Sequence, residues 1–257
     1  MSTKIIATVG PASFGPSIIR GMTSAGVDTF RVNMSHTEVE DFETVYTLVN
    51  EWTDKPVCPD TQGVRIRPSR NQHGFTDKDI KVFPLLNKLR VPMVFLSFCS
   101  YAEDVKRLKE YFDYKVFVVS KIESTQGLRN LKEICRVSDE ILIDRGDLSN
   151  DVPLVKIPYA QDYIMEQAWA LNTPVHVATN LMESMLTESE PTRAEVNDIV
   201  KTLDAGASGL VLAGETALGR FPEKAVTVLR DIIDVRDSYS ELDGSTEDVA
   251  IIEWLLK

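Results

Sequence analysis

The chain has 257 residues, and its 39 Asp and Glu residues outnumber 28 Lys and Arg, so the formal net charge is −11. This charge disfavours contact with nucleic acid phosphates and with anionic membrane surfaces, and we expect neither as a partner. With 43% hydrophobic and 26% charged residues, the composition is that of a globular protein with a substantial core. An anionic substrate would have to be met by local positive charge.

The sequence shows neither a signal peptide nor a run of about 18 apolar residues that would span a membrane. Its cysteines, Cys58, Cys99 and Cys135, are scattered and form no CxxC pair. This arrangement predicts free thiols in a reducing compartment, and we expect a cytoplasmic protein.

Short apolar runs rich in β-branched residues alternate with segments of helical periodicity. Strands are predicted at residues 5–9, 29–34, 56–60, 91–98, 115–123, 140–144, 174–179 and 210–213. Helices are predicted at residues 16–25, 38–52, 76–90, 102–112, 127–136, 159–171, 193–205 and 222–234. Strands that alternate with helices form parallel sheets with right-handed crossovers.

Eight such units favour an α/β fold with a single (β/α)8 TIM barrel over residues 1–236. The alternative is an open doubly wound sheet, which usually has a glycine-rich fingerprint after the first strand. This sequence contains no GxGxxG, Walker A, GxSxG or HExxH motif.

Residues 237–257 form a C-terminal extension. The stretch Ser245-Thr246-Glu247-Asp248 has the form of a capping box and precedes an apolar stripe, Ile251, Ile252, Leu255 and Leu256. We expect a short helix here that packs on the barrel or, alternatively, on a neighbouring subunit.

Polar residues follow almost every predicted strand, at the end where barrel enzymes carry their active sites. Arg31, Asn33 and Ser35 share one face of the second strand because side chains alternate with a period of two. The other strands end in Asp60 and Thr61, Lys121 and Glu123, Asp144 to Asp147, Thr179 and Asn180, and Glu215 and Thr216.

These residue types suggest binding of ions and of an anion. Glu123 and Asp147 are hard oxygen ligands on neighbouring strands, as Mg²⁺ prefers. Lys121 and Arg31 would face a bound anion. The oxygens that suit a monovalent cation belong to Asn33, Ser35, Asp60 and Thr61.

Nine stretches resemble the catalytic barrel domain of the pyruvate kinase family, and they occur in the family's order along residues 3–234. They are TKIIATVGPAS (3–13), RVNMSH (31–36), DTQGVRIR (60–67), SFCSYAEDV (97–105), SKIES (120–124), DRGDL (144–148), ATNLMESM (178–185), PTRAEVND (191–198) and AGETALGRFP (213–222).

The resemblance implies specific roles. Glu123 and Asp147 would bind Mg²⁺ or Mn²⁺, and K⁺ would lie on Asn33, Ser35, Asp60 and Thr61. Arg31 and Lys121 would hold the transferring phosphoryl group or an enolate oxygen. The substrate carboxylate would be oriented by the hydroxyl of Thr179 and the backbone of Arg145, Gly146 and Asp147. Arg67 and His36 match positions near the nucleotide phosphates.

The chain also departs from the family pattern. The family's lid domain is replaced by a short loop at residues 68–74, and we expect no C-terminal regulatory domain. The substituted positions are Gln62 (lysine in the family), Val64-Arg65 (Pro-Glu), Ser100 (arginine), Asp144 (a small residue), Asn180 (glutamine) and Ala213 (serine).

Three interpretations follow. The first is phosphoryl transfer between phosphoenolpyruvate and a nucleotide, which requires mainly positioning and charge neutralisation. The second is a nucleotide-independent lyase, a 2-oxo acid decarboxylase or aldolase, that uses the same enolate machinery and in which Asp144 would act as an added general base. The third is a non-catalytic module that binds phosphoenolpyruvate. We expect a small anionic substrate, with a nucleotide as an optional one, and a homo-oligomer.

Overall fold

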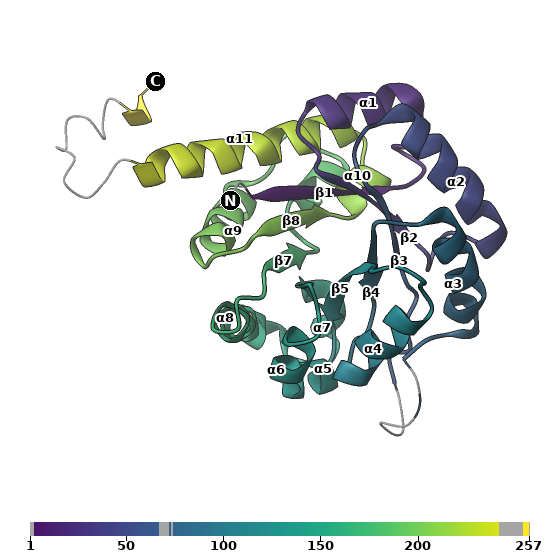
Figure 1. Cartoon of the computed structure of the whole chain (residues 1–257). Helices are drawn as coiled ribbons and strands as arrows, with labels where there is room; N and C mark the ends of the chain where they lie inside the picture. Colours follow the sequence, from purple (N-terminus) through teal and green to yellow (C-terminus); the bar gives the residue numbers. More distant parts are fainter. Residues whose placement is uncertain (1–2, 67–71, 73, 242–253, 257) are drawn as a thin grey trace.

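The computed structural model describes residues 3–66, 72, 74–241 and 254–256. Its eight strands form one closed parallel barrel in sequence order, which confirms the predicted (β/α)8 fold (Figure 1). The strands are β1 (Lys4–Val9), β2 (Thr29–Asn33), β3 (Val57–Asp60), β4 (Met93–Leu96), β5 (Phe117–Ile122), β6 (Glu140–Asp144), β7 (Val175–Ala178) and β8 (Gly209–Leu212).

Helices form a ring around this barrel (Figure 1). The longer helices are α1 (Pro16–Ser24), α2 (Val39–Trp52), α3 (Asp77–Leu89), α4 (Ala102–Glu110), α8 (Ile157–Trp169), α9 (Arg193–Asp204) and α11 (Pro222–Glu241). Side-chain caps fix where several begin: Thr76 and Asp79 form a capping box at α3, and Thr192 and Glu195 form one at α9.

Some elements differ from the sequence prediction. The helix expected at 127–136 is divided into α5 (Thr125–Arg129) and α6 (Leu131–Cys135), because Asn130 between them leaves helical geometry. Four single-turn elements were not predicted, since each is too short to show a periodicity. They are α7 (Arg145–Leu148), the 3₁₀ turns η1 (Leu154–Lys156) and η2 (Glu183–Leu186), and α10 (Gly214–Ala217).

Helix α11 continues to Glu241, beyond the end expected at residue 234. Most of the predicted C-terminal helix, including its capping box and Ile251 and Ile252 of its apolar stripe, lies outside the described residues. Within residues 254–256, the indole N–H of Trp254 donates a hydrogen bond to Ser238 Oγ at 3.0 Å, and its ring lies 5.3 Å from that of Tyr239. This end of the chain therefore contacts α11.

The inside of the barrel is layered because inward side chains recur every second residue along each strand. The middle layer is apolar and contains Ile6, Cys58, Phe95, Val119, Leu142, Ala178 and Val211. The next inward positions toward the carboxyl ends are polar and buried: Thr8, Asp60, Ser97, Lys121 and Asp144. The polar inward layer therefore lies toward the carboxyl ends of the strands, and the apolar middle layer forms the floor beneath it. None of the described helices has the length and apolar character needed to cross a membrane.

Candidate active site

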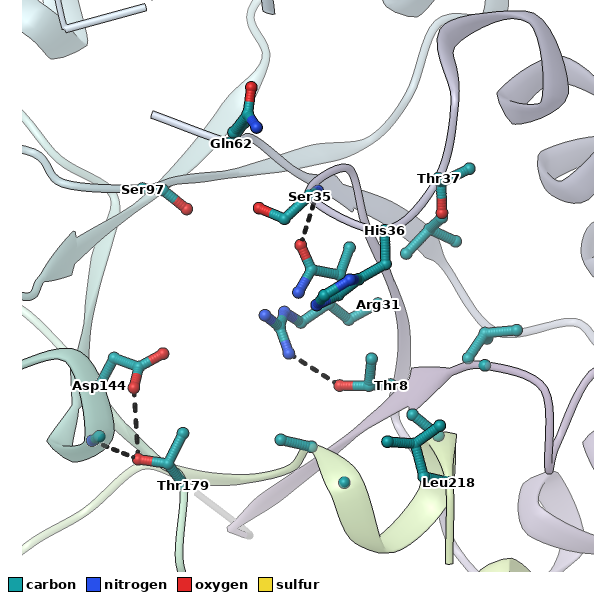
Figure 2. Close-up of a pocket in the computed structure, with 18 of the residues that line it drawn as sticks. Thr8, Arg31, Ser35, His36, Thr37, Gln62, Ser97, Asp144, Thr179 and Leu218 are labelled. Carbon is teal, nitrogen blue, oxygen red and sulfur yellow. Dashed lines mark hydrogen bonds between the residues drawn. The ribbon is translucent and has the colours of Figure 1, made fainter. Parts of the chain in front are cut away.

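A cavity of about 800 Å³ opens at the carboxyl ends of the strands. Figure 2 shows its polar side chains pointing inward, with Asp144 and Thr179 across the cavity from Arg31 and His36. The cavity brings together residues at or just beyond the carboxyl ends of all eight strands, which are far apart in sequence.

Asp60 links the two buried cations of the site. Its Oδ2 accepts hydrogen bonds from Arg31 Nε at 2.5 Å and Lys121 Nζ at 3.1 Å, and its Oδ1 accepts one from Ser97 Oγ at 2.8 Å. Burial disfavours the charged form of Asp60, but the charges of Arg31 and Lys121 outweigh it and hold the pKa below its usual range. Asp60 is therefore a carboxylate that fixes both cations at the cavity floor.

Lys121 is surrounded by carboxylates. Its Nζ lies 2.8 Å from Glu123 Oε1 and 3.6 Å from Asp144 Oδ2, in addition to its contact with Asp60. Burial alone would lower the pKa of Lys121, but the three negative charges raise it above its ordinary value. The side chain is thus a permanent positive charge and not a proton acceptor.

Three carboxylates meet beside this lysine. Glu123, Asp144 and Asp147 each offer one oxygen within 4.8 Å of the others. Glu123 is only 1% exposed, and its Oε2 accepts a hydrogen bond from the amide of Phe98 at 2.5 Å. Its Oε1 is buried and, among the described residues, has no hydrogen-bond partner, although Lys121 Nζ is near it.

The electrostatics of these carboxylates fit a divalent cation. Burial and the charges of Asp144 and Asp60 raise the pKa of Glu123 to about 7, against the opposing effect of Lys121. Burial and Asp144 likewise raise the pKa of Asp147. Hard carboxylate oxygens that carry excess negative charge, one of them buried without a hydrogen-bond partner among the described residues, are the donor set that Mg²⁺ or Mn²⁺ prefers.

Thr179 joins the ends of β6 and β7. Its Oγ1 accepts a hydrogen bond from the amide of Gly146 at 2.7 Å and lies 3.3 Å from Asp144 Oδ1. Its φ of 71° is in the left-handed region, which is strained for a β-branched residue. The contacts hold the hydroxyl at the cavity wall, where the sequence predicted a substrate contact.

The side chain of Arg145 points elsewhere. Its guanidinium donates hydrogen bonds to the carbonyl oxygens of Thr179 and Asn180, and pairs with Asp198 at 2.7 Å. Arg145 does not line the cavity. Its side chain braces the loop after β7, so the predicted substrate contact concerns only its backbone.

The four residues predicted for K⁺ are neighbours, because Asn33 and Asp60 are in register on β2 and β3. Asn33 Oδ1 accepts a hydrogen bond from the amide of Ser35 at 3.0 Å, and Thr61 Oγ1 accepts one from the amide of Ser97 at 2.9 Å. The alternative is that Asp60 only pairs with a cation, and Asp60 does pair with Arg31 and Lys121. The potassium site stays a prediction.

His36 lines the cavity, and its lining also includes the apolar residues Val9, Pro11, Phe14, Val45 and Leu218. Arg67, which was predicted near the nucleotide phosphates, lies outside the described residues.

Sequence reasoning did not assign Thr8 and Ser97, although both line the cavity. Thr8 Oγ1 accepts a hydrogen bond from Arg31 Nη1 at 2.8 Å, and Ser97 contacts Asp60 and Lys121. Both occupy the position two residues beyond an inward apolar residue, Ile6 or Phe95. The two-residue period, applied to every strand, would have identified them.

Comparison with known proteins agrees with this geometry. The family model described as "Pyruvate kinase, barrel domain" matches residues 1–87 and 71–226, two segments that meet near the connection between β3 and α3. A chloroplastic pyruvate kinase isozyme A from Ricinus communis is 43% identical over 147 residues, which cover 55% of this chain and 25% of that protein.

Archaeal pyruvate kinases are also similar. The enzyme from Methanocaldococcus jannaschii is 37% identical over 186 residues, which cover 71% of this chain and 42% of the relative. The one from Thermoplasma acidophilum is 26% identical over 326 aligned positions, which cover 95% of this chain and 60% of the relative. The chain thus spans a quarter to three fifths of the length of these proteins. Because the family model covers most of the barrel, the chain belongs to the pyruvate kinase family through its barrel domain.

Proposed function

We propose that the chain transfers a phosphoryl group between phosphoenolpyruvate and a nucleotide through a pyruvate enolate. The observation that carries this proposal is the buried Lys121, fixed at the floor of the cavity by Asp60, Glu123 and Asp144. A preorganised positive charge in a buried site stabilises an oxygen that becomes negative during the reaction.

Arg31 and Lys121 act together on the anionic substrate. Both are held by Asp60, so their positive charges are in place before the substrate arrives. Arg31 holds the phosphoryl group, and Lys121 faces the oxygen that becomes the enolate oxygen. The backbone at residues 145–147 and the hydroxyl of Thr179 orient the substrate carboxylate.

Glu123 and Asp147 would hold Mg²⁺ or Mn²⁺, which supplies positive charge that neutralises substrate oxygens. Asn33, Ser35, Asp60 and Thr61 would hold K⁺. His36 and Arg67 would lie toward the nucleotide phosphates, and the apolar residues of the cavity lining would accept the rest of the nucleotide.

A second candidate is a nucleotide-independent lyase that cleaves a 2-oxo acid. The observation in its favour is the short connection between the end of β3 at Asp60 and the start of α3 at Asp77, which leaves no room for a lid domain. A lid excludes water from a transferring phosphoryl group, whereas decarboxylation or aldol cleavage has no such requirement. A non-catalytic phosphoenolpyruvate-binding module is the third possibility.

Phosphorus NMR of the phosphate compounds, together with proton NMR of pyruvate, distinguishes these functions. The chain is incubated with phosphoenolpyruvate, Mg²⁺ and K⁺, with and without ADP, and separately with oxaloacetate. Conversion of phosphoenolpyruvate to pyruvate with formation of ATP when ADP is present, and no conversion without ADP, supports phosphoryl transfer, and Li⁺ in place of K⁺ should slow it. Pyruvate from oxaloacetate without nucleotide supports the lyase. Binding of phosphoenolpyruvate without conversion of either substrate supports the regulatory module.

The matched variants are Glu123→Gln and Asp113→Asn. The first removes a carboxylate of the cavity, and the second removes an exposed carboxylate paired with Arg90. Either catalytic function predicts that Glu123→Gln is inactive and that Asp113→Asn keeps full activity.

A further inference from the structure

Asp144 is the carboxylate that the sequence adds to the family pattern, and the proposed function gives it no role beyond its contact with Lys121. It is the last residue of β6 and is 5% exposed. Since Ile122 pairs with Ile143 between β5 and β6, Glu123 and Asp144 are next in the same register. Their side chains therefore project to the same side, above the apolar floor.

The contacts of Asp144 are long for a buried carboxylate. Among the described residues, its Oδ1 lies 3.3 Å from Thr179 Oγ1 and 3.4 Å from the amide of Asp147, and its Oδ2 lies 3.6 Å from Lys121 Nζ. Asp60, equally buried, makes hydrogen bonds of 2.5 to 3.1 Å. Buried carboxylates normally have close partners, so Asp144 has capacity left for another ligand.

The summed formal charge of the surrounding side chains also indicates that a further ligand belongs near Asp144. The rim cluster comprises Arg31, Asp60, Lys121, Glu123, Asp144 and Asp147, two cations and four carboxylates with a formal sum of −2. A divalent cation makes the cluster neutral, whereas without Asp144 the loaded cluster would carry +1. Glu123 Oε1 is buried beside Lys121 and accepts no hydrogen bond from the described residues, which is an independent sign that a ligand belongs among these carboxylates.

We propose that Asp144 is a third carboxylate ligand of the divalent cation, so that this chain binds the ion without the help of substrate. The inference rests on the proposed function only in taking Glu123 and Asp147 as the other ligands. Two protein carboxylates leave Mg²⁺ to be completed by substrate and water, and a third replaces one water and strengthens binding of the free ion.

The competing role of Asp144 is purely structural, since its side chain also caps the first turn of α7. Asp144→Asn separates the two roles, because asparagine caps a helix as well as aspartate does but lacks the negative charge. Asp144→Ala restores a small residue of the kind usual in the family, and Asp113→Asn is the remote control.

The test is Mn²⁺ binding by titration calorimetry in the absence of substrate, with water proton relaxation to count water on the bound ion. We expect Asp144→Asn and Asp144→Ala to bind Mn²⁺ at least about tenfold more weakly than the unmodified chain, with more bound water. Asp113→Asn should be unchanged, and circular dichroism checks that every variant is folded.

Glu123→Gln and Asp147→Asn separate this inference from the function. If both weaken Mn²⁺ binding but Asp144→Asn does not, Asp144 is only a cap and the inference is wrong, while the proposed function stands. If none of the three changes Mn²⁺ affinity, the metal site itself is wrong, and the metal-dependent function is wrong with it.

Discussion

Both ends of the barrel contain buried charges, but they are balanced differently. At the amino ends of the strands, the basal cluster consists of Lys4, Glu140 and His176. Glu140 Oε1 pairs with Lys4 Nζ at 2.7 Å, and Glu140 Oε2 contacts His176 Nε2 at 2.5 Å. One carboxylate thus lies between two nitrogens, and both its oxygens are used.

The rim cluster contains two cations and four carboxylates, and a cavity of about 800 Å³ lies beside them. Glu140 has a pKa below its ordinary value because His176 and Lys4 outweigh the effect of burial, whereas burial and neighbouring carboxylates raise that of Glu123 to about 7. This difference indicates that the charges of the basal cluster pair with one another and stabilise the barrel. The rim cluster, in contrast, has negative charge available to bind a ligand.

The largest expected effect is at the rim. Lys121→Met removes the charge opposite the developing enolate and should lower turnover by ~10²–10³. Steady-state assay of phosphoryl transfer measures the loss, and Lys81→Met, which removes an exposed lysine of α3, serves as control. If turnover stays near that of the unmodified chain, Lys121 is not the main electrostatic catalyst and the role belongs to Arg31.

At the basal end, the addition of a methyl group at Gly209 should destabilise the folded state. A Cβ at Gly209 would lie 2.2 Å from His176 Nδ1, so Gly209→Ala should lower the free energy of unfolding by about 1–3 kcal/mol. Urea denaturation measures this change. Gly15→Ala is the control, since nothing lies within 4 Å of a Cβ there. Equal stability of the two variants would contradict the tight packing inferred for His176.

Glu140→Gln tests the balance of charge at the same end. Because folding lowers the pKa of Glu140, its charge stabilises the folded state above its ordinary pKa of 4.5, and this contribution disappears as the pH falls below that value. We expect a loss of about 1 kcal/mol at pH 7, since Lys4 is partly exposed. Urea midpoints of the variant and the unmodified chain should converge as the pH falls below the ordinary pKa of 4.5. A constant difference would show that packing, not charge, is responsible.

The smallest effect on the free energy of unfolding is expected for a change in the rim cluster. This change should stabilise the folded state, whereas the two changes at the basal end should destabilise it. With divalent ions chelated, Asp144→Asn removes one negative charge from an excess and should raise the free energy of unfolding by up to about 1 kcal/mol. Thermal unfolding in EDTA and then in excess Mg²⁺ measures it, and Mg²⁺ should reverse the order of stability. Destabilisation in EDTA would mean that the attraction between Asp144 and Lys121 outweighs the repulsion among the carboxylates.

Strand order and barrel closure were predictable because apolar runs and helical periodicities alternate eight times along the chain. The position of Glu123 beside Asp147 followed from their places at neighbouring strand ends. The turn of Arg145 away from the cavity was not predictable, because it depends on carbonyl groups after β7 and on Asp198. The proximity of Asp144 to Glu123 required the register of β5 and β6.

The most direct test of the contrast between the two ends is X-ray diffraction from a crystal of the chain soaked in Mn²⁺. The data are collected at a wavelength where manganese scatters anomalously. The account predicts one strong anomalous peak bonded to the carboxylates of Glu123 and Asp147, and none at Glu140 and His176. A peak at the basal cluster, or none at the rim cluster, would contradict it.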